Sequence, residues 1–360
     1  MMARVDVRAL EAFIASAFEA AGMTAEDAAI GATVLVRTEA RGLVTHGVRH
    51  VPRYVRAMQA GGVDPKGRFE IIRETTSTAT VDGNAGLGHV VATKAMRLAM
   101  AKAARAGVSA VLVRNSSHLG ALGQYALLAA EADMIAMVYS TTPRVMKVPG
   151  SRSAVVGSSP VAYAVPSTGT PFVLDIAMSV VAGNKVTMAR ERNEPLPDGW
   201  IVGADGLPST NPDDYRSGGA LLPIGGHKGF GLALFGELLA GALSGLDWDG
   251  ADRFKTHRPG SVYFADLSPA DQWNSGHAFV VLDVKAFMDP DELRGRVDRL
   301  TSIIRESAPE PGSAGVRIPG DRAHADEARA NREGLLLSAG TWAALEELAR
   351  ELAIDAPKES

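Results

Sequence analysis

The middle of this chain carries short apolar runs and both of its ends carry helical patterns, and this division constrains the fold more than any other feature. The runs have the length of buried strands and lie at residues 108–113, 134–139, 161–165 and 172–174. Polar turns follow several of them. The pattern predicts an α+β protein in which a helical layer built from both chain ends lies around an α+β middle.

The helical patterns have clear bounds. The predicted helices span 7–21, Thr24 to about Glu39, 51–58, 88–106, 121–132, 291–306, 321–333 and 340–353, and further predicted strands span 70–73, 78–82 and 277–283. We expect three parts, which are a helical N-terminal part at 1–75, an α+β domain at 76–310, and C-terminal helices at 311–360 that return to the N-terminal part.

The longest apolar stretch runs from Gly229 to Leu246. It is rich in glycine and contains Glu237, which predicts a closely packed buried helix and not a membrane span. The segment from Asp249 to Asn274 holds several prolines and reads as irregular.

Composition narrows the class of protein. The formal net charge of −4 argues against binding to nucleic acids or anionic membranes, which favour surplus lysine and arginine. The absence of cysteine excludes disulfides, thiolate nucleophiles, iron–sulfur ligation and sulfur-based zinc sites. The N-terminal residues lack the apolar core of a signal peptide, so we expect a cytoplasmic protein.

His46 is the strongest candidate for chemistry. It lies between two helical patterns in a segment that also contains Thr45, Gly47 and arginines at 41, 49 and 53. An imidazole beside a hydroxyl and several guanidinium groups suits proton transfer to a substrate that carries a carboxylate.

A second polar loop follows the strand at 108–113. Backbone N–H groups in the loop from Asn115 to His118 could hold a phosphate at the start of the next helix. For the serines alone, helix capping by Ser116 or Ser117 is the favoured explanation. His118 beside Gly120 fits a binding loop better than a cap.

Two further polar residues have both a chemical and a structural interpretation. Asp175 follows an apolar strand, where it could orient the His46 imidazole or serve as a cap or turn residue. Lys228 lies between glycines, where it could contact a phosphate or ribose or simply be solvated.

The spacing of His46 and His50 also permits a metal site, because it can place two imidazoles on one helical face. No glutamate lies between them, so an acidic third ligand such as Asp175 would come from elsewhere in the chain. The histidines at 89, 257, 277 and 324 lack convergent polar neighbours in the sequence and are expected to be structural or surface residues.

Six motifs, taken together, give the chain a resemblance to a known family. They are Thr45-His-Gly47 followed by Val51-Pro-Arg-Tyr54, Asn115-Ser-Ser-His-Leu-Gly120, Gly157-Ser-Ser-Pro160, Asp175-Ile-Ala-Met-Ser179, Gly226-His-Lys-Gly-Phe-Gly231 and Arg317-Ile-Pro-Gly-Asp321. In this order they resemble the malate/L-lactate dehydrogenase family, which includes sulfolactate, ureidoglycolate and diketogulonate dehydrogenases and Δ1-piperideine-2-carboxylate reductases.

The resemblance implies a non-Rossmann NAD(P)-binding fold with a mostly antiparallel mixed sheet and a helical domain from both termini. This agrees with the lack of a Gly-x-Gly-x-x-Gly motif after any predicted strand. The resemblance also implies a homodimer with its active site near the subunit interface. The activity it implies is NAD- or NADP-dependent reduction of a 2-oxo acid or a related imine.

The resemblance assigns roles residue by residue. The proton donor maps to His46, assisted by Thr45 and Asp175, and some members instead credit the histidine that maps to His118. No metal is implied. The implied cofactor-binding residues are His118, Leu119, Gly120, Ala121, Leu122, Ser158, Ser159, Pro160, Asp175, Ile176, Ala177, Met178, Ser179, His227, Lys228, Pro319, Gly320 and Asp321.

Three positions depart from the family pattern. Thr45 stands where serine is usual and keeps the hydroxyl. Gly157-Ser-Ser-Pro160 replaces Gly-Thr-Asn-Pro and lacks its amide. The arginine expected four residues after the catalytic histidine is His50 here, and Arg49 precedes it, so substrate binding is assigned to Arg49, His50 or Arg53.

The leading hypothesis is therefore hydride transfer between nicotinamide and C2 of a small 2-hydroxy or 2-oxo acid, with His46 handling the proton. A cyclic-imine reductase is the first alternative. A metal-dependent hydrolase or lyase that uses His46 and His50 is a second, and a nicotinamide-binding protein without catalysis is a third.

Overall fold

A computed structural model describes residues 3–246, 274–313 and 315–359. Its α-helices are α1 Val7–Ala20, α2 Ala25–Ala40, α3 Val51–Gln59, α4 Gly88–Ala106, α5 Gly123–Ala130, α6 Gly183–Glu191, α7 Pro212–Arg216, α8 His227–Gly236, α9 Pro290–Arg305, α10 Asp321–Glu333 and α11 Ala339–Leu352. Two 3-10 helices, η1 Val48–His50 and η5 Val284–Ala286, and a π-helix, η2 Glu237–Ala242, complete the helical elements of these residues.

The strands are short. They are β1 Ala3–Val5, β2 Glu70–Glu74, β3 Thr78–Asp82, β4 Val108–Ser116, β5 Met134–Ser140, β6 Met146–Lys147, β7 Ala154–Val156, β8 Val161–Val165, β9 Phe172–Ile176, β10 Ile201–Val202, β11 Pro208–Ser209, β12 Ala220–Leu221, β13 Ser275–Asp283 and β14 Leu335–Leu337. No described helix is both long enough and apolar enough to span a lipid bilayer.

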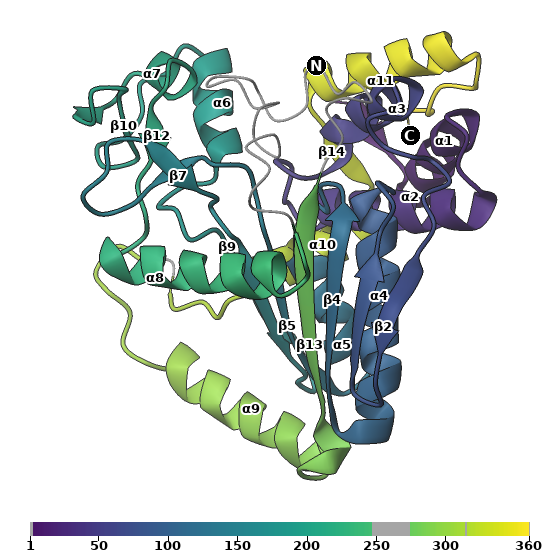
Figure 1. Ribbon diagram of the computed structural model, residues 1–360, viewed down its shortest axis with the longest axis vertical. Coiled ribbons are helices and arrows are strands. Elements are labelled where there is room, and N and C mark those ends of the chain that lie inside the picture. The colour runs from purple at the N-terminus through teal and green to yellow at the C-terminus, as the bar shows by residue number, and fades with distance from the viewer. Residues whose placement is uncertain (1–2, 247–273, 314, 360) are drawn as a thin grey trace.

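The main sheet forms the centre of the molecule (Figure 1). Among the described residues it contains seven strands in the order β2-β3-β4-β13-β5-β8-β9. Only the pairing of β3 with β4 is parallel, and the other neighbours are antiparallel. The α+β prediction is confirmed, and the described strands include all those expected from the apolar runs.

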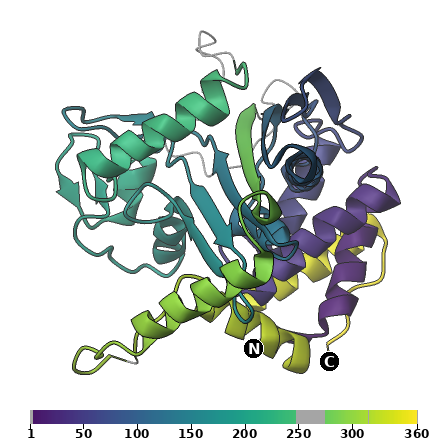
Figure 2. The same ribbon diagram turned by 90° about the horizontal axis from the view of Figure 1, so that it is seen from below.

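Each face of this sheet has its own helical cover, because successive side chains of a strand point to opposite faces. Val111 and Val113 of β4 pack with residues of α4 and α5, whereas Leu112 between them packs with residues of α8 and η2. Figure 2 shows the sheet between α8 on one side and α4 on the other. The central strands are therefore covered on both faces, which explains why they read as continuous apolar runs, whereas the edge strand β2 is exposed.

A second, five-stranded sheet has the order β11-β10-β12-β6-β7 in the described residues. Helices α6 and α7 contact each other beside it (Figure 1). Its core joins Ile201 and Leu221 to Met146 and to the α8 side of the main sheet. This small unit brings α6 toward the ends of the main-sheet strands.

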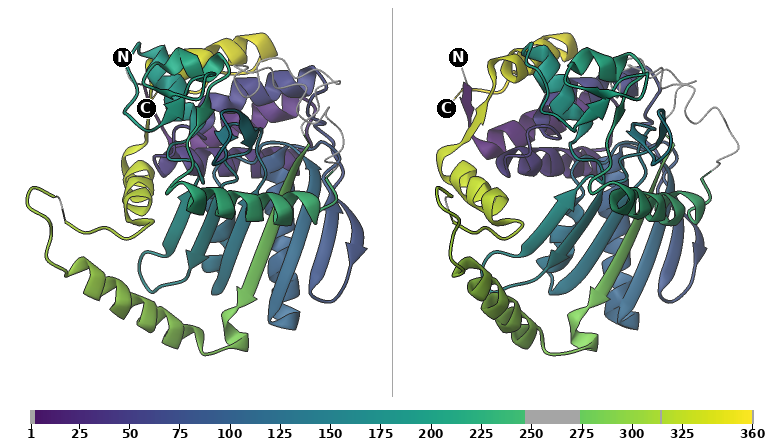
Figure 3. Two further views of the ribbon diagram at one scale, coloured as in Figure 1. Left: turned by 60° about the vertical axis from the view of Figure 1, so that its left-hand side comes forward. Right: turned by 90° about the vertical axis from the view of Figure 1, so that its left-hand side faces the viewer.

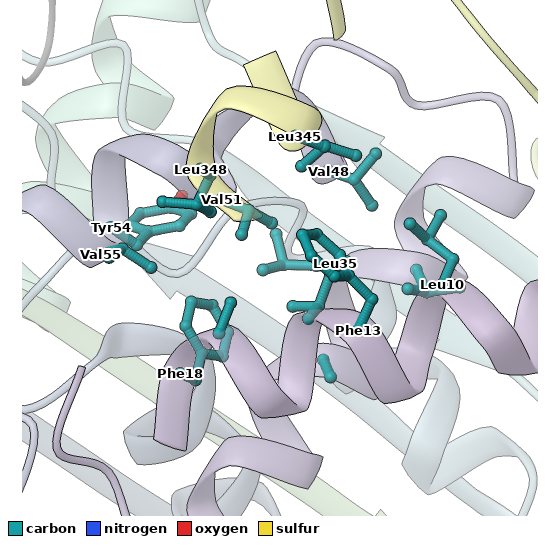
Figure 4. Close-up of a cluster of buried hydrophobic side chains, with 14 of the residues drawn as sticks. Leu10, Phe13, Phe18, Leu35, Val48, Val51, Tyr54, Val55, Leu345 and Leu348 are labelled. Carbon is teal, nitrogen blue, oxygen red and sulfur yellow. The ribbon is translucent and has the colours of Figure 1, made fainter. Parts of the chain in front are cut away.

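A third core holds helices from the two ends of the chain together. Leu10, Phe13 and Phe18 of α1 pack with Leu345 and Leu348 of α11 in one buried cluster (Figure 4). Strand β1 pairs with β14, so the termini are also joined by backbone hydrogen bonds. The cluster contains Tyr54, whose hydroxyl points out of this apolar core.

Local signals explain why the helix predictions agree with the structure. The Thr24 hydroxyl accepts a hydrogen bond from the Asp27 N–H at 3.2 Å and caps α2. Helix α4 spans the predicted residues and ends at Gly107, whose φ of 79° suits glycine. The predicted irregular segment at 249–274 and His257 lie almost wholly outside the described residues.

The prediction of a buried helix over 229–246 is wrong in one respect. Helices α8 and η2 do occupy this stretch, but Leu232, Phe235, Leu238 and Leu243 are each more than half exposed. Only one face of the helix packs on the sheet, through Ala233 and Ala240, and none of the described residues covers the opposite apolar face.

Candidate functional site

A cavity of about 890 Å³ opens where the main sheet, the helical layer and α6 meet. Most of its wall comes from loops that follow strands, as expected for a binding site in an α+β protein. The described segments that line it include residues 42–46, 118–122, 140–143, 175–177 and 179–185, with Ser158, Pro160, Met188, Ala189, Arg192, Glu194, Pro195, Pro197, Trp200, Ile224, Ser275 and Arg322.

His46 lies on this wall in the loop between α2 and η1. Its Nδ1 is hydrogen-bonded to the Thr45 hydroxyl at 2.9 Å, so its Nε2 edge is the one left to face a ligand. Burial lowers the pKa of His46 to about 4. This imidazole is therefore neutral at pH 7.

Glu39 fixes the backbone just beyond His46. Its carboxylate accepts a hydrogen bond from the Val48 N–H at 3.0 Å, and burial raises its pKa to about 7. A Cβ atom at Gly47 would lie only 2.0 Å from the Glu39 Oε2. The glycine of the His46-Gly47 motif is thus required by the close approach of this carboxylate.

His118 lies on the same wall, after the end of β4. Its ring is stacked on His46 with 5.8 Å between ring centroids, and its Nδ1 is hydrogen-bonded to the Tyr54 hydroxyl at 2.7 Å. Burial, reinforced by the neighbouring imidazoles, holds the pKa of His118 well below its usual range. The two histidines named as alternative proton donors are therefore neighbours in one cluster.

His89 belongs to this cluster although the sequence suggested a structural or surface residue. It is 1% exposed, and its ring centroid lies 5.0 Å from Tyr54 and 6.3 Å from His118. Its Nε2 would be 2.9 Å from a Cβ atom at Gly120, a residue with φ of 74°. Burial lowers the pKa of His89 to about 3. Its position in α4, far from the other histidines in sequence, gave no signal of this contact.

Asp175 also lines the cavity, at the end of β9. Its carboxylate accepts a hydrogen bond from the Gly123 N–H at 2.8 Å at the start of α5. Burial raises its pKa to about 6. The capping role is therefore present in the structure, while the carboxylate remains on the wall that carries His46.

The phosphate site expected at the start of the helix after His118 is not supported. The Asp175 carboxylate takes the Gly123 N–H at that helix end, which removes a donor and adds negative charge. The Ser117 hydroxyl accepts from the Gly88 N–H at 2.7 Å, so it caps α4 and not α5. A serine cap was predicted, but for the wrong helix.

Arg49, His50 and Arg53 are not among the described residues that line the cavity. Arg49 forms an ion pair with Glu191 of α6 at 3.4 Å. The His50 Nε2 donates to the Thr45 carbonyl oxygen at 2.8 Å. The cations that do line the described cavity are Lys185, Arg192 and Arg322, which the sequence did not single out.

The structure brings most of the expected cofactor residues to the cavity. Those on its wall are His118, Leu119, Gly120, Ala121, Leu122, Ser158, Pro160, Asp175, Ile176, Ala177 and Ser179. Ser159, Met178, His227, Lys228, Pro319, Gly320 and Asp321 are not on its described wall. Ser159 is buried and donates to Glu237 at 2.7 Å, whereas Asp321 pairs with Arg305.

Residues 180–197 form the largest part of the wall that sequence reasoning missed. They follow the Asp175-Ile-Ala-Met-Ser179 motif directly, which was the available signal. The metal site suggested by the spacing of His46 and His50 has no further evidence in the structure. Residues 3–246, 274–313 and 315–359 contain no group of three His, Asp or Glu side chains able to hold a metal ion.

A nicotinamide dinucleotide fits this cavity by size and chemistry. A volume of about 890 Å³ is near the upper end of ordinary ligand pockets. The Ser158 hydroxyl and the cations of the α6 side could meet ribose and phosphate groups.

Comparison with known proteins gives a consistent result. A family model described as malate/L-lactate dehydrogenase matches residues 5–346. The chain is 34% identical over 326 residues to a malate dehydrogenase of Pyrococcus abyssi, covering 89% of this chain and 86% of that protein. It is 32% identical over 334 residues to an L-sulfolactate dehydrogenase of Methanocaldococcus jannaschii, covering 93% of each.

A solved structure of Δ1-piperideine-2-carboxylate reductase from Pseudomonas syringae has a similar fold. The TM-score is 0.81 at 28% sequence identity, over 97% of this chain and 99% of that chain.

Proposed function

This chain belongs to the malate/L-lactate dehydrogenase family and is an oxidoreductase, and on that premise we propose that it transfers a hydride between a nicotinamide cofactor and C2 of a small 2-hydroxy or 2-oxo acid. The observation that carries the proposal is the stacked pair His46 and His118 on the wall of one cavity. Two imidazoles beside a space for a dinucleotide are the groups needed to move one proton next to a hydride acceptor.

The cofactor is NADH or NADPH in the reductive direction. When bound, it supplies the hydride, and the protein supplies position and the proton. We propose that the nicotinamide ring binds against the loops at 118–122 and 175–179, together with Ser158 and Pro160 of the same cavity. Lys185, Arg192 and Arg322 are the described cations available to phosphate groups or to a substrate carboxylate.

His46 is the proposed proton donor, and His118 is the alternative. Thr45 holds His46 through Nδ1, and Tyr54 holds His118 through Nδ1, so both rings have a fixed orientation. Burial favours the neutral form of both rings, and a bound carboxylate would favour the protonated form of the imidazole that it approaches. Asp175 adds a buried carboxyl to the same wall.

A cyclic-imine reductase remains the second candidate. The likeness to a reductase with that substrate favours it, because hydride addition to C=N needs the same proton and the same cofactor. Binding of nicotinamide without catalysis is the alternative in which the histidine cluster has no chemical role.

A homodimer is also proposed. The uncovered apolar face of α8 and η2, with Leu232, Phe235 and Leu238 more than half exposed, supports it. Helix α9 lies at the lower edge of the molecule in Figure 3. It supports a dimer as well, because it has no buried residue and carries exposed Leu300 and Ile303. Light scattering of the purified protein tests this, and a monomer across micromolar concentrations would overturn it.

The function is tested by following the absorbance of NADH and NADPH with a panel of 2-oxo acids and cyclic imines. We expect oxidation of one or both nucleotides with a 2-oxo acid such as oxaloacetate, pyruvate or sulfopyruvate. Turnover of cyclic imines alone would select the second candidate. Nucleotide binding without turnover of any of these compounds would contradict both.

A further inference from the structure

The Thr45 carbonyl oxygen receives hydrogen bonds from two different parts of the fold. His50 Nε2, in η1, donates to it at 2.8 Å, and Asn184 Nδ2, in α6, donates to it at 2.9 Å. The side chain of the same residue is hydrogen-bonded to His46 Nδ1 at 2.9 Å. Backbone and side chain of Thr45 are thus held at three points.

The hydrogen bond from His50 to the Thr45 carbonyl requires a proton on His50 Nε2, because a carbonyl oxygen can only accept. The ring is 5% exposed, and burial lowers its pKa to about 3. The neutral imidazole therefore carries its proton on Nε2. His50 was expected to contact the substrate, but its Nε2 is hydrogen-bonded to the backbone of Thr45.

Asn184 reaches the same oxygen from α6. It lies in the first turn of α6 and lines the cavity next to Lys185. At the other end of α6, Glu191 pairs with Arg49 at 3.4 Å. Helix α6 therefore contacts the segment around His46 at both of its ends.

The peptide unit that contains the Thr45 carbonyl is planar and also contains the His46 nitrogen. Its orientation sets the starting direction of both side chains. If the carbonyl turns, the Thr45 hydroxyl and the His46 ring lose their relative position. A hydrogen bond to this oxygen therefore acts on the reacting imidazole without touching it.

We propose that His50 and Asn184 are a pair of positioning residues that hold the Thr45 carbonyl, and through it the His46 ring, so that the proton donor is aligned only when α6 is seated against the His46 segment. The effect on turnover rests on the proposed function. The effect on the His46 ring does not, and it is measured separately.

The kinetic test uses variants that remove or restore a single donor. His50→Phe keeps a ring but has no donor, and His50→Gln restores an N–H at a similar reach. We expect His50→Phe to lower kcat roughly 5- to 10-fold with KM for both substrates within about twofold, and His50→Gln to recover most of the loss. Asn184→Ala is expected to resemble His50→Phe.

Thr187→Val is the matched control in α6. The Thr187 hydroxyl donates to the Gly183 carbonyl within the same helix and, among the described residues, makes no hydrogen bond to the His46 segment. It should change kcat by less than about twofold. An equal loss in Thr187→Val and Asn184→Ala, or no recovery in His50→Gln, would show a merely structural role.

Nitrogen-15 NMR of labelled histidines tests the geometry without any turnover. In the wild-type protein at pH 7.5 we expect a neutral His50 with the proton on Nε2, and in Asn184→Ala a changed nitrogen shift for His46 but not for His324, which is exposed on α10 and does not line the cavity. A His50 proton on Nδ1, or an unchanged His46 in Asn184→Ala, would overturn the inference. If wild-type protein oxidises neither nucleotide while these shifts behave as expected, only the proposed function fails.

Discussion

The two walls of the cavity are built in different ways. On one wall, which we call the histidine wall, His46 and His118 are backed by buried His50, His89 and Tyr54 and are fixed by hydrogen bonds or ring contacts. The other wall is formed by residues of the segment 180–197. It carries two exposed cations, Lys185 and Arg192. The contrast separates the tasks, because a rigid neutral cluster suits proton transfer and exposed cations suit the binding of anions.

The largest expected effect comes from removing the imidazole nearest to Thr45. His46→Ala should lower kcat by about 100- to 10,000-fold, the usual contribution of a general acid, while the Kd for the nucleotide changes little. Steady-state kinetics and nucleotide fluorescence titration measure the two quantities. His118→Ala assayed beside it identifies which imidazole donates the proton.

His324→Ala is the control for this prediction. His324 is exposed on α10 and is not on the cavity wall. Near-normal kcat in His46→Ala would remove this residue from the mechanism, and the histidine wall would then need a different role.

The second effect concerns stability against acid. Burial lowers the pKa values of His46, His50 and His89 to about 4, 3 and 3, so on unfolding they take up protons at any pH below their ordinary value of 6.5. His118 acts in the same direction. Stability from this cluster is complete above pH 6.5 and is lost as the pH falls toward 4.

Two carboxyls oppose this trend. The pKa values of Glu39 and Asp175 are raised to about 7 and 6, so these groups release protons on unfolding and reduce the net uptake near pH 5 from about four to about two. The free energy of unfolding should then fall by roughly 3 kcal/mol per pH unit. Urea titrations at pH 7, 6 and 5 measure this slope, and a flat profile would contradict the described burial.

His89→Leu sharpens the same measurement. Neither ring nitrogen of His89 has a hydrogen-bond partner among the described residues, so an apolar side chain of similar size is tolerated. We expect the net proton uptake on unfolding to fall by about one, so that the free energy of unfolding depends less steeply on pH. An unchanged slope would mean that His89 is charged or solvated in the folded protein.

The sequence predicted the local structure of this site better than its contacts. Helix α4 and the cap at Thr24 follow from periodicity and from residues a few positions apart. The bond between Tyr54 and His118 joins residues 64 positions apart, and that between Asn184 and Thr45 joins residues 139 apart. No periodic pattern encodes such pairs, because they depend on how the elements pack.

The motifs brought the right loops together but gave some residues the wrong neighbours. His46, His118 and Asp175 do share one cavity. Asp175 nevertheless bonds to the start of α5, and His50 bonds to the backbone. Helix α8 was expected to be buried because its composition is apolar, but composition does not say whether the covering surface belongs to the same chain.

A smaller loss of kcat should follow from removing the hydrogen bond between Tyr54 and His118. Tyr54→Phe keeps the ring in the helical core of Figure 4 and removes only the hydroxyl bonded to His118 Nδ1. We expect kcat to fall about 5- to 10-fold, since a net hydrogen bond is worth about 1 kcal/mol. Tyr125→Phe is the matched variant, because the buried Tyr125 hydroxyl donates to the Leu119 carbonyl. Equal losses of kcat in the two variants would show general loosening and not a specific role for Tyr54.

The smallest effect, and the one that addresses the other wall, comes from Lys185→Gln. Lys185 is exposed at the start of α6, where an ion pair with a bound phosphate or carboxylate is worth less than about 1 kcal/mol. We expect the Kd for the nucleotide or the KM for the acid to rise about two- to fivefold at low salt, and the difference from wild type to shrink as ionic strength increases. Because Lys185 does not contact the histidine wall in the described structure, kcat at saturation should stay within about twofold. A fall in kcat comparable to that of Tyr54→Phe would erase the division between the two walls, since it would show that the exposed cation also acts on the proton transfer.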